Sequence, residues 1–278
     1  MQINVLQCQS GRDFDENLAF LHEQMETLDR ADDEEQLIVL PECVLLFGGH
    51  ESLQIKAMGE DNQFVSVLSK LAAQHQVYLV AGTVPELATD GRYYSRSYVF
   101  GPQGQIMGQY DKLHLFDVDV ADGTKQYRES ETFCPGEQVS VVDTPIGKIG
   151  LAICYDLRFP ELFQAMREQG ADIIALPAAF TKVTGKAHWQ TLLQARAVET
   201  QTYVVAAAQW GQHPSSRRET WGHSMIVNPW GEIVAEKLSD TGWVQARPDF
   251  AKMNSIRNEM PVLKHKRFQS ATLKSIEN

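Results

Sequence analysis

Apolar positions along the chain form short continuous runs that alternate with stripes at helical spacing. The runs at 37–40, 149–153, 173–176 and 203–207 predict strands that are buried on both faces, and further strands are expected at 3–7 and 77–84. A stripe of Leu18, Leu21, Met25 and Leu28 predicts a helix at 13–30, and the pattern also predicts helices at 63–75 and 187–201. Strands that alternate with helices are typical of an α/β chain.

The second half of the chain repeats the plan of the first half. Segments 173–177, 203–207 and 224–233 resemble 37–41, 78–82 and 97–106, and the helix at 187–201 takes the place of the helix at 63–75. Segment 98–107 is expected to be a hairpin, because Gly101, Pro102 and Gly104 provide turn residues. The pattern therefore predicts two related β-α-β-β halves; chance similarity is the alternative, because strands and turns use few residue types.

Burial on both faces determines how the halves are expected to pack. Each half has helices for one face of its sheet, so the other face must be covered by the other sheet. This predicts an α/β fold (α+β in some classifications) arranged as a four-layer α-β-β-α sandwich, with strand ends from both halves at one rim. No Pro/Gly/Ser linker divides the chain, so residues 1–278 are expected to form a single domain. The tail at 249–278 is expected to lie at a subunit interface or to fray.

Composition excludes several classes of partner. The net charge is -11 and the pI is about 5.2, which argues against nucleic acid and membrane surfaces as partners. The chain shows neither an apolar run of the ~18–20 residues that span a bilayer nor a signal peptide. No metal-ligand spacing or glycine-rich phosphate loop is present, so no metal and no cofactor are expected. The scattered cysteines suggest free thiols and a cytoplasmic location; they are Cys8, Cys43, Cys134 and Cys154.

Cys154 stands where the apolar run at 149–153 stops. A polar turn follows it, and Pro160 then opens a helical pattern, since proline is tolerated in the first helical turn. A thiol on such a strand-to-helix turn is exposed at the rim of a sheet, with backbone N–H groups that can receive an oxyanion. The alternative is a small buried residue that ends a strand, which is common for free cysteine.

Three further polar side chains are candidates for chemistry. Glu42 follows a buried run and Pro41, where an unpaired carboxylate is costly and a shielded one can transfer protons near neutral pH. Lys112 lies among apolar residues and could lower the pKa of a neighbouring thiol or stabilise an oxyanion. Glu129 lies in a long stretch before Pro135 and Gly136 that is expected to be irregular.

Three motifs in order carry a family resemblance: LPE at 40–42, YDKLHLF at 110–116 and ICYDLRFPE at 153–161. Together they resemble the nitrilase, or carbon–nitrogen hydrolase, superfamily, whose members have a four-layer fold, a Glu-Lys-Cys triad and dimers or larger assemblies. The resemblance implies that Glu42, Lys112 and Cys154 form the triad and that Glu129 is the second glutamate beside it. It also implies a small-molecule amide substrate and a homodimer or higher homo-oligomer.

The implied reaction is acyl transfer through a thioester. Glu42 would take the proton of Cys154 as the sulfur attacks an amide carbonyl, while Lys112 and the backbone N–H of Tyr155 hold the oxyanion. Glu42 would then protonate the leaving nitrogen and activate the water that hydrolyses the thioester.

Residues near the same rim are candidates for substrate binding. Arg158 could clamp a substrate carboxylate, although a salt bridge to Glu161 or Asp156 is an equal alternative. The remaining candidates are Phe180, Thr181, Lys182, Thr184 and His188.

The stretch 177–199 is similar to the branch whose members cleave deaminated glutathione into 2-oxoglutarate and cysteinylglycine. The runner-up is ω-amidase action on 2-oxoglutaramate or 2-oxosuccinamate, and nitrile hydrolysis is a third reading. From a different class, the chain could be a non-catalytic scaffold of the same fold, or Cys154 could be a redox thiol.

Overall fold

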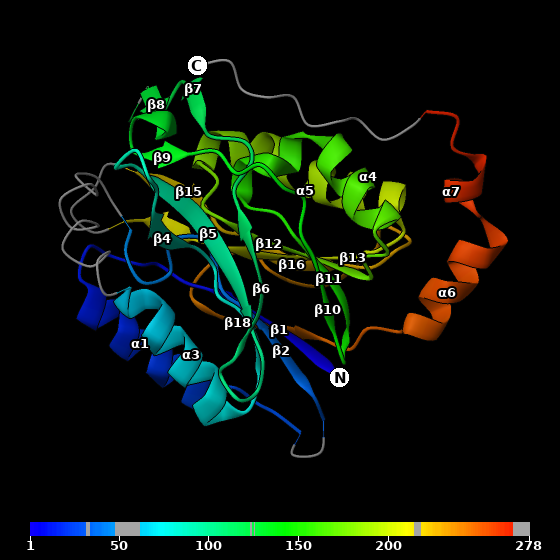
Figure 1. Ribbon diagram of the computed structural model, residues 1–278, viewed down its shortest axis with the longest axis horizontal. Helices are drawn as coiled ribbons and strands as arrows, with labels where there is room; N and C mark the ends of the chain where they lie inside the picture. The colour runs from blue at the N-terminus through cyan, green and yellow to red at the C-terminus, as the bar shows by residue number, and fades with distance from the viewer. Residues whose placement is uncertain (32–33, 48–61, 123, 125, 214–217, 269–278) are drawn as a thin grey trace.

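The apolar runs form the parallel centres of two separate sheets (Figure 1). The computed structural model describes residues 1–31, 34–47, 62–122, 124, 126–213 and 218–268. The first sheet is built on β1 (Gln2–Gln7), β2 (Gln36–Val39) and β3 (Tyr78–Val80), and the second on β11 (Gly147–Leu151), β12 (Ile173–Ala178) and β13 (Tyr203–Ala208).

Antiparallel strands flank each parallel trio in the same way. A hairpin lies beside the third strand of each trio, and an antiparallel strand lies beside the first. The first sheet has β5 (Tyr93–Phe100), β6 (Ile106–Asp111) and β18 (Gly242–Ala246); the second has β16 (Ser224–Val227), β17 (Ile233–Lys237) and β10 (Val141–Thr144).

The predicted repeat is confirmed in detail. The two hairpins carry bulges at corresponding places, Val99–Phe100 and Ile226–Val227. The helices at 63–75 and 182–200 both end at a glutamine in the left-handed conformation, Gln76 and Gln201. Because β18 returns to the first sheet after the second sheet is complete, the chain ties the halves together. This topology supports the single domain, which stays a prediction.

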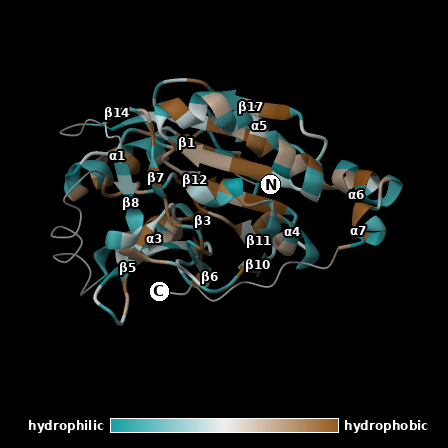
Figure 2. Cartoon of the chain, turned by 90° about the horizontal axis from the view of Figure 1, so that it is seen from above, coloured by the Kyte–Doolittle hydropathy of each residue, from teal (hydrophilic) through white to brown (hydrophobic). Residues whose placement is uncertain are grey.

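Helices cover the outer face of each sheet. α1 (Phe14–Thr27) and α3 (Gln63–His75) lie on one side of the strands, and α4 (Pro160–Glu168) and α5 (Lys182–Thr200) lie on the other (Figure 1). Figure 2 shows α5 and α3 on opposite sides of the strands from a second direction. α5 begins before the predicted position because the hydroxyl of Thr181 caps it by accepting from Thr184 N. α1 ends earlier than predicted because Leu28 is already extended.

Alternation along the strands divides the core into two clusters. Leu37 and Val39 face the second sheet, whereas Ile38 and Leu40 face α1 and α3. Both faces are therefore buried, which is why these strands have continuous apolar runs. The predicted four-layer α-β-β-α arrangement is confirmed.

Short elements complete the rim. β4 (Val84–Leu87) and β9 (Phe133–Cys134) extend the first sheet beside β5. Stretch 117–135 is not irregular as predicted, since it contains a hairpin and a 3₁₀ turn that carries Glu129. These elements are β7 (Asp117–Asp119), β8 (Gln126–Arg128) and η1 (Glu129–Glu131); η2 (Cys154–Arg158) follows β11, and β14 (Trp210–Gln212) pairs with β15 (Glu219–Trp221).

The described part of the tail is helical. α6 (Phe250–Glu259) and α7 (Val262–His265) lie beyond α4 in both views (Figures 1 and 2). Arg257 fastens α6 to the second sheet through Asp172 at 2.8 Å and the carbonyl of Ala171 at 2.9 Å. Residues 269–278 of the tail lie outside the described residues, and an interface role stays a prediction. Over the described ranges, none of the helices combines the length and apolar character that crossing a bilayer requires.

We predict that Gly82→Ala destabilises the fold more than the same change at Gly91. Both glycines have positive φ, +66° and +87°, so both substitutions strain the backbone by about 1–2 kcal/mol. At Gly82 a Cβ would also lie 2.2 Å from the carbonyl oxygen of Pro41, whereas nothing lies within 4 Å at Gly91. Urea unfolding should show a total loss of roughly 2–4 kcal/mol at Gly82, and equal losses at both positions would contradict the steric account.

Candidate active site

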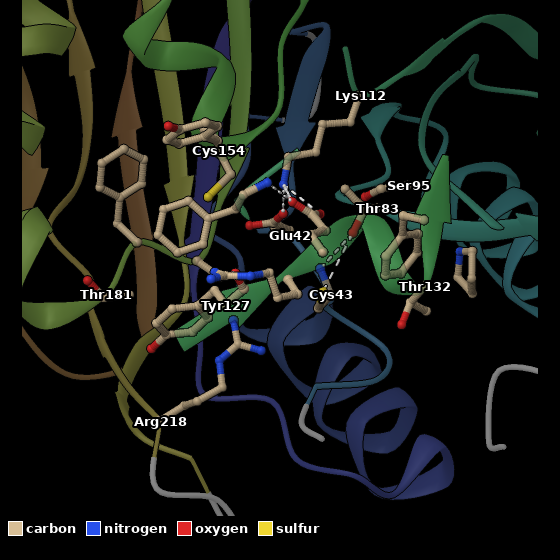
Figure 3. Close-up of a pocket in the computed structure, with 18 of the residues that line it drawn as sticks. Glu42, Cys43, Thr83, Ser95, Lys112, Tyr127, Thr132, Cys154, Thr181 and Arg218 are labelled. Atoms are coloured by element: carbon tan, nitrogen blue, oxygen red, sulfur yellow. Dashed lines mark hydrogen bonds and ion pairs between the residues drawn. The ribbon is translucent and has the colours of Figure 1, made fainter. Parts of the chain in front are cut away.

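Three side chains from different elements meet at the rim where strand ends of both sheets lie. Glu42 follows the end of β2, Lys112 follows β6, and Cys154 follows β11. Figure 3 shows Lys112 and Cys154 pointing toward Glu42. The family resemblance implied this convergence, and strand ends from both halves were expected to meet at one rim.

A buried ion network centres on Lys112, whose side chain is 2% exposed. Its Nζ donates to Glu42 Oε1 at 3.0 Å and to both Glu129 oxygens, at 2.8 and 2.9 Å. Glu129 Oε2 also accepts from the backbone N–H of Phe116 at 2.6 Å. A buried ammonium is tolerated only with such pairing, and two carboxylates for one cation leave the cluster with an excess negative charge.

This charge balance controls the titration of the cluster. Burial raises the pKa of the Cys154 thiol well above its usual value, and the charge of Glu42 raises it further, although Lys112 opposes both. Lys112 was expected to lower the thiol pKa; it does so, but the other two effects are larger. Burial also raises the pKa of Glu129, against the attraction of Lys112. For Lys112, burial opposes the charged form, but Glu129, Glu42 and Cys154 together raise its pKa well above the ordinary value.

Cys154 therefore carries its proton at neutral pH, and an acceptor for that proton is adjacent. The Glu42 carboxylate lies near enough to the thiol for its charge to raise the pKa of Cys154. The backbone N–H of Ala179 also contacts the sulfur. Transfer of the proton to Glu42 would move a negative charge from carboxylate to sulfur without changing the total charge of the cluster.

The backbone at Cys154 is strained. Its φ is +48°, a conformation that is unfavourable for a residue with a Cβ. Asp156, fully buried, stabilises the turn, because its Oδ2 accepts from Ile153 N at 2.8 Å. Strain held in place by surrounding bonds is frequent at functional sites.

Asp156 also connects the cysteine turn to the lysine segment. Its carboxylate accepts from Tyr110 Oη at 2.8 Å and from His114 N at 3.1 Å, and it contacts His114 Nδ1 at 2.7 Å. Tyr110 and His114 flank Lys112. The buried carboxylate of Asp156 therefore fixes the segment that carries Lys112 relative to the turn that carries Cys154. The sequence analysis considered Asp156 only as a partner for Arg158 and missed this role.

Residues of both halves hold the turn at Glu42. Its backbone carbonyl accepts from Gln209 Nε2 at 3.0 Å, and the next amide, Cys43 N, donates to Thr83 Oγ1 at 2.9 Å. Gln209 follows β13 and is fully buried, and it also binds Ser10 through its side-chain oxygen. Cys43 has φ +57°, so both Glu42 and Cys154 lie at sharp, left-handed turns.

The ion network opens into a cavity of about 300 Å³, large enough for a small acyl group. Of the predicted substrate contacts, Phe180, Thr181 and Thr184 line this cavity, together with Tyr155, the triad candidates and Glu129. Other lining residues had no signal in the sequence; they include Cys43, Phe116, Tyr127, Arg128 and Arg218.

Three predicted substrate contacts do not line the cavity: Arg158, His188 and Lys182. Arg158 lies against the rings of Tyr155 and Phe180, at 5.7 and 5.4 Å, and its Nη1 is 3.2 Å from His188 Nδ1. In the described structure Arg158 pairs with neither Asp156 nor Glu161, and Asp156 instead binds within the turn. Lys182 pairs with Glu219 at 2.6 Å on the surface.

All four cysteines are free thiols. Within the ranges that the structure describes, no three histidine, cysteine or carboxylate side chains converge in a way that could hold a metal ion. For chemistry the described site offers a thiol, two carboxylates and an ammonium group.

Comparisons with known proteins agree in finding carbon-nitrogen hydrolases and amidases as relatives. The family model for carbon-nitrogen hydrolase matches residues 2–258. A deaminated glutathione amidase of Yersinia enterocolitica is 42% identical over 97% of this chain and 94% of its own length. The omega-amidase NIT2 of Homo sapiens is 38% identical over 84% of this chain and 83% of its own length.

Solved structures share the fold. Nit3 of Saccharomyces cerevisiae, described as a member of branch 10 of the nitrilase superfamily, has a TM-score of 0.81 and 33% identity over 96% of this chain and 97% of its own. The NitFhit protein of C. elegans has a TM-score of 0.86 and 38% identity over 96% of this chain. This chain spans only 65% of the length of NitFhit.

We predict that Glu42→Gln makes the Cys154 thiol more acidic. The glutamate charge disfavours the thiolate, so its removal leaves Lys112 opposed by Glu129 alone and lowers the thiol pKa. The alkylation rate of the Cys154 peptide with iodoacetamide, followed by mass spectrometry from pH 6 to 10, should rise at lower pH than in the unsubstituted protein.

Glu131→Gln is the matched control, because Glu131 lies in the same 3₁₀ turn as Glu129 but is exposed. Its alkylation profile should match that of the unsubstituted protein. A Glu42→Gln profile that stays in place, or that moves to higher pH, would contradict the electrostatic account.

Proposed function

The chain belongs to the carbon–nitrogen hydrolase family, and from that premise we propose that it is an amidase that hydrolyses deaminated glutathione to 2-oxoglutarate and cysteinylglycine. The observation that carries the reaction class is the meeting of Glu42, Lys112 and Cys154 at the base of one cavity. The relative named for this substrate, which matches over nearly the whole chain, supports the choice of amide.

In the first half of the proposed reaction, Glu42 accepts the proton of Cys154 as the sulfur attacks the amide carbonyl. Cys154 points toward Glu42 (Figure 3), and the closeness of the two side chains supports this transfer. Lys112, already aligned by two carboxylates, and the backbone N–H of Tyr155 stabilise the oxyanion. Glu42 then gives its proton to the leaving nitrogen, cysteinylglycine departs, and a 2-oxoglutaryl thioester remains.

In the second half, Glu42 takes a proton from water, which attacks the thioester and releases 2-oxoglutarate. Glu129 contributes as a positioning residue, because its bidentate contact with Lys112 fixes the ammonium group. The raised pKa of Glu129 is consistent with a position away from solvent, where water does not weaken that contact.

The second candidate is ω-amidase activity on 2-oxoglutaramate or 2-oxosuccinamate. It is favoured by the similarity to the omega-amidase NIT2 of Homo sapiens, at 38% identity. Both candidates share an acyl group with a terminal carboxylate and differ in the leaving group, which is a dipeptide in one and ammonia in the other.

The proposal includes a homodimer or larger assembly and a cytoplasmic location. Exposed apolar side chains on α5 and the neighbouring hairpin support an assembly, because Val198 and Trp230 are 52% and 55% exposed. The described tail, fastened by Arg257, could extend such an interface. Four free thiols support a reducing compartment.

We predict that Lys112→Ala lowers kcat by about 10²–10³ or more, because an oxyanion donor is lost and two buried carboxylates are left facing each other. Steady-state kinetics with deaminated glutathione measures this. Lys148→Ala is the control, since that side chain is 45% exposed and pairs with Asp143 at the surface. Near-normal turnover by folded Lys112→Ala would refute the role.

We predict that kcat/KM for deaminated glutathione exceeds that for 2-oxoglutaramate, and that intact-protein mass spectrometry after rapid acid quench detects a 2-oxoglutaryl adduct on Cys154. Cys154→Ser should show no such thioester. A preference for 2-oxoglutaramate would favour the ω-amidase reading, and turnover of none of the amides would favour a non-catalytic scaffold.

A further inference from the structure

Glu42 stands beside a residue whose backbone conformation is unfavourable. Cys43 has φ +57°, in the left-handed region that residues with a Cβ rarely adopt. A turn of this kind keeps its shape only when surrounding bonds hold it. The position of the Glu42 carboxylate relative to Cys154 therefore depends on the groups that bind this turn.

Side chains from outside the turn bind three consecutive residues of it. The bonds run from Gln209 Nε2 to the Glu42 carbonyl at 3.0 Å, from Cys43 N to Thr83 Oγ1 at 2.9 Å (Figure 3), and from Ser10 Oγ to the Val44 carbonyl at 2.7 Å. Ser10 and Thr83 belong to the first half of the chain, as the turn itself does. Gln209 reaches the turn from the second half, where it follows β13.

The side chain of Gln209 is fully buried, and Ser10 orients its amide. Gln209 Oε1 accepts from Ser10 N at 2.9 Å, while Nε2 donates to Ser10 Oγ at 2.8 Å as well as to the Glu42 carbonyl. Because the amide oxygen can only accept and the amide nitrogen can only donate, these bonds distinguish the two ends of the amide. The donor to Glu42 is therefore fixed in direction before a substrate binds.

The backbone of Gln209 leads to the side of the site that carries Cys154. Gln209 N donates at 2.9 Å to the carbonyl of Ala178, the last residue of β12. The next residue, Ala179, lines the cavity and has its backbone N–H at the sulfur of Cys154. One residue therefore joins the carbonyl of Glu42 to the strand end that contacts the thiol.

The repeat gives this connection equivalent ends. Segment 173–177 corresponds to 37–41, so Ala178 has the place in the second half that Glu42 has in the first. Gln209 binds the carbonyls of both, one with its side-chain amide and the other with its backbone N–H. Cys8, which directly follows β1, also pairs with Gln209 in a parallel bridge, so the connection lies where the two sheets meet.

We propose that Gln209 is a positioning residue that sets the distance between the carboxylate of Glu42 and the thiol of Cys154. The inference rests on the proposed amidase function for the roles of base and nucleophile. Gln209 is not among the described residues that line the cavity, so its loss should slow bond breaking more than it weakens substrate binding. Proton transfer requires hydrogen-bond distance, and a displacement of about 1 Å can cost about 100-fold in rate.

Gln209→Met tests the proposal, because methionine is similar in length and volume but cannot donate a hydrogen bond to Glu42. We expect kcat for deaminated glutathione to fall about 10- to 100-fold, while KM changes less than about threefold. Burial and then the charge of Glu42 raise the pKa of the Cys154 thiol, so a displaced Glu42 should raise it less. The iodoacetamide profile of Cys154 should therefore move to lower pH, by less than in Glu42→Gln.

Gln7→Met is the matched control for a purely structural effect. Gln7 is also fully buried, and its amide donates to the Asp240 carbonyl and accepts from Ser224 N, both at 2.8 Å, which joins β1 to β16. This variant should lose stability in urea as Gln209→Met does, but keep the kcat and the alkylation profile of the unsubstituted protein. Equal losses of kcat in the two variants, or a Gln209→Met protein whose kcat or profile is unchanged, overturn the positioning role.

Ser10→Ala keeps the test decisive if Gln209→Met does not fold. It removes the hydroxyl that helps to orient the Gln209 amide but keeps the backbone N–H, so smaller changes in the same direction are expected. Unchanged kcat and an unchanged profile in this variant would also overturn the role. The alkylation profile requires no turnover, so if the unsubstituted protein hydrolyses no amide while the profile still depends on Gln209, the proposed function fails and the positioning of Glu42 stands.

Discussion

The site depends on one buried ammonium group. Lys112 is almost completely removed from water, and a charge in that position costs several kcal/mol unless other charges compensate it. Glu42 and Glu129 compensate it, but with one negative charge more than neutrality requires. Burial, and after it the charge of Glu42, explains why the adjacent thiol keeps its proton. In the proposed reaction the thiolate forms by movement of that proton within the cluster, so no solvent-exposed base is required.

The repeated fold holds the charged side chains of the site in fixed positions, which this balance of charges requires. Glu42 and Cys154 leave corresponding ends of two related sheets, and each is held by the rest of the fold and not by local sequence. Gln209 binds the carbonyl of Glu42 from the second half of the chain, while Asp156 joins the cysteine turn to both neighbours of Lys112. An error of even 1 Å in either turn would separate the proton donor from its acceptor, since such transfers operate at hydrogen-bond distance.

Features with a strong local signal were predictable from the sequence. Continuous apolar runs indicated β2, β12 and β13, because strands covered on both faces require them. The family resemblance, which three motifs in order carry, indicated that Glu42, Lys112, Glu129 and Cys154 lie together. Features that depend on tertiary contacts were not predictable. The hairpin at 117–128 has little apolar periodicity, and the role of Asp156 arises from bonds to Tyr110 and His114, more than forty residues away.

Arg218 illustrates the same limit. In the sequence it is one of two adjacent arginines near a short strand, and only the fold places it on the wall of the cavity, with Phe47 and Tyr127 beside it. Arg158, close to Cys154 in sequence, was the stronger candidate for that reason alone. The buried cluster belongs to strand ends in the core, whereas Arg218 belongs to the peripheral hairpin of β14 and β15. A side chain that reaches the cavity from a peripheral hairpin leaves no local pattern in the sequence, so only the tertiary structure reveals it.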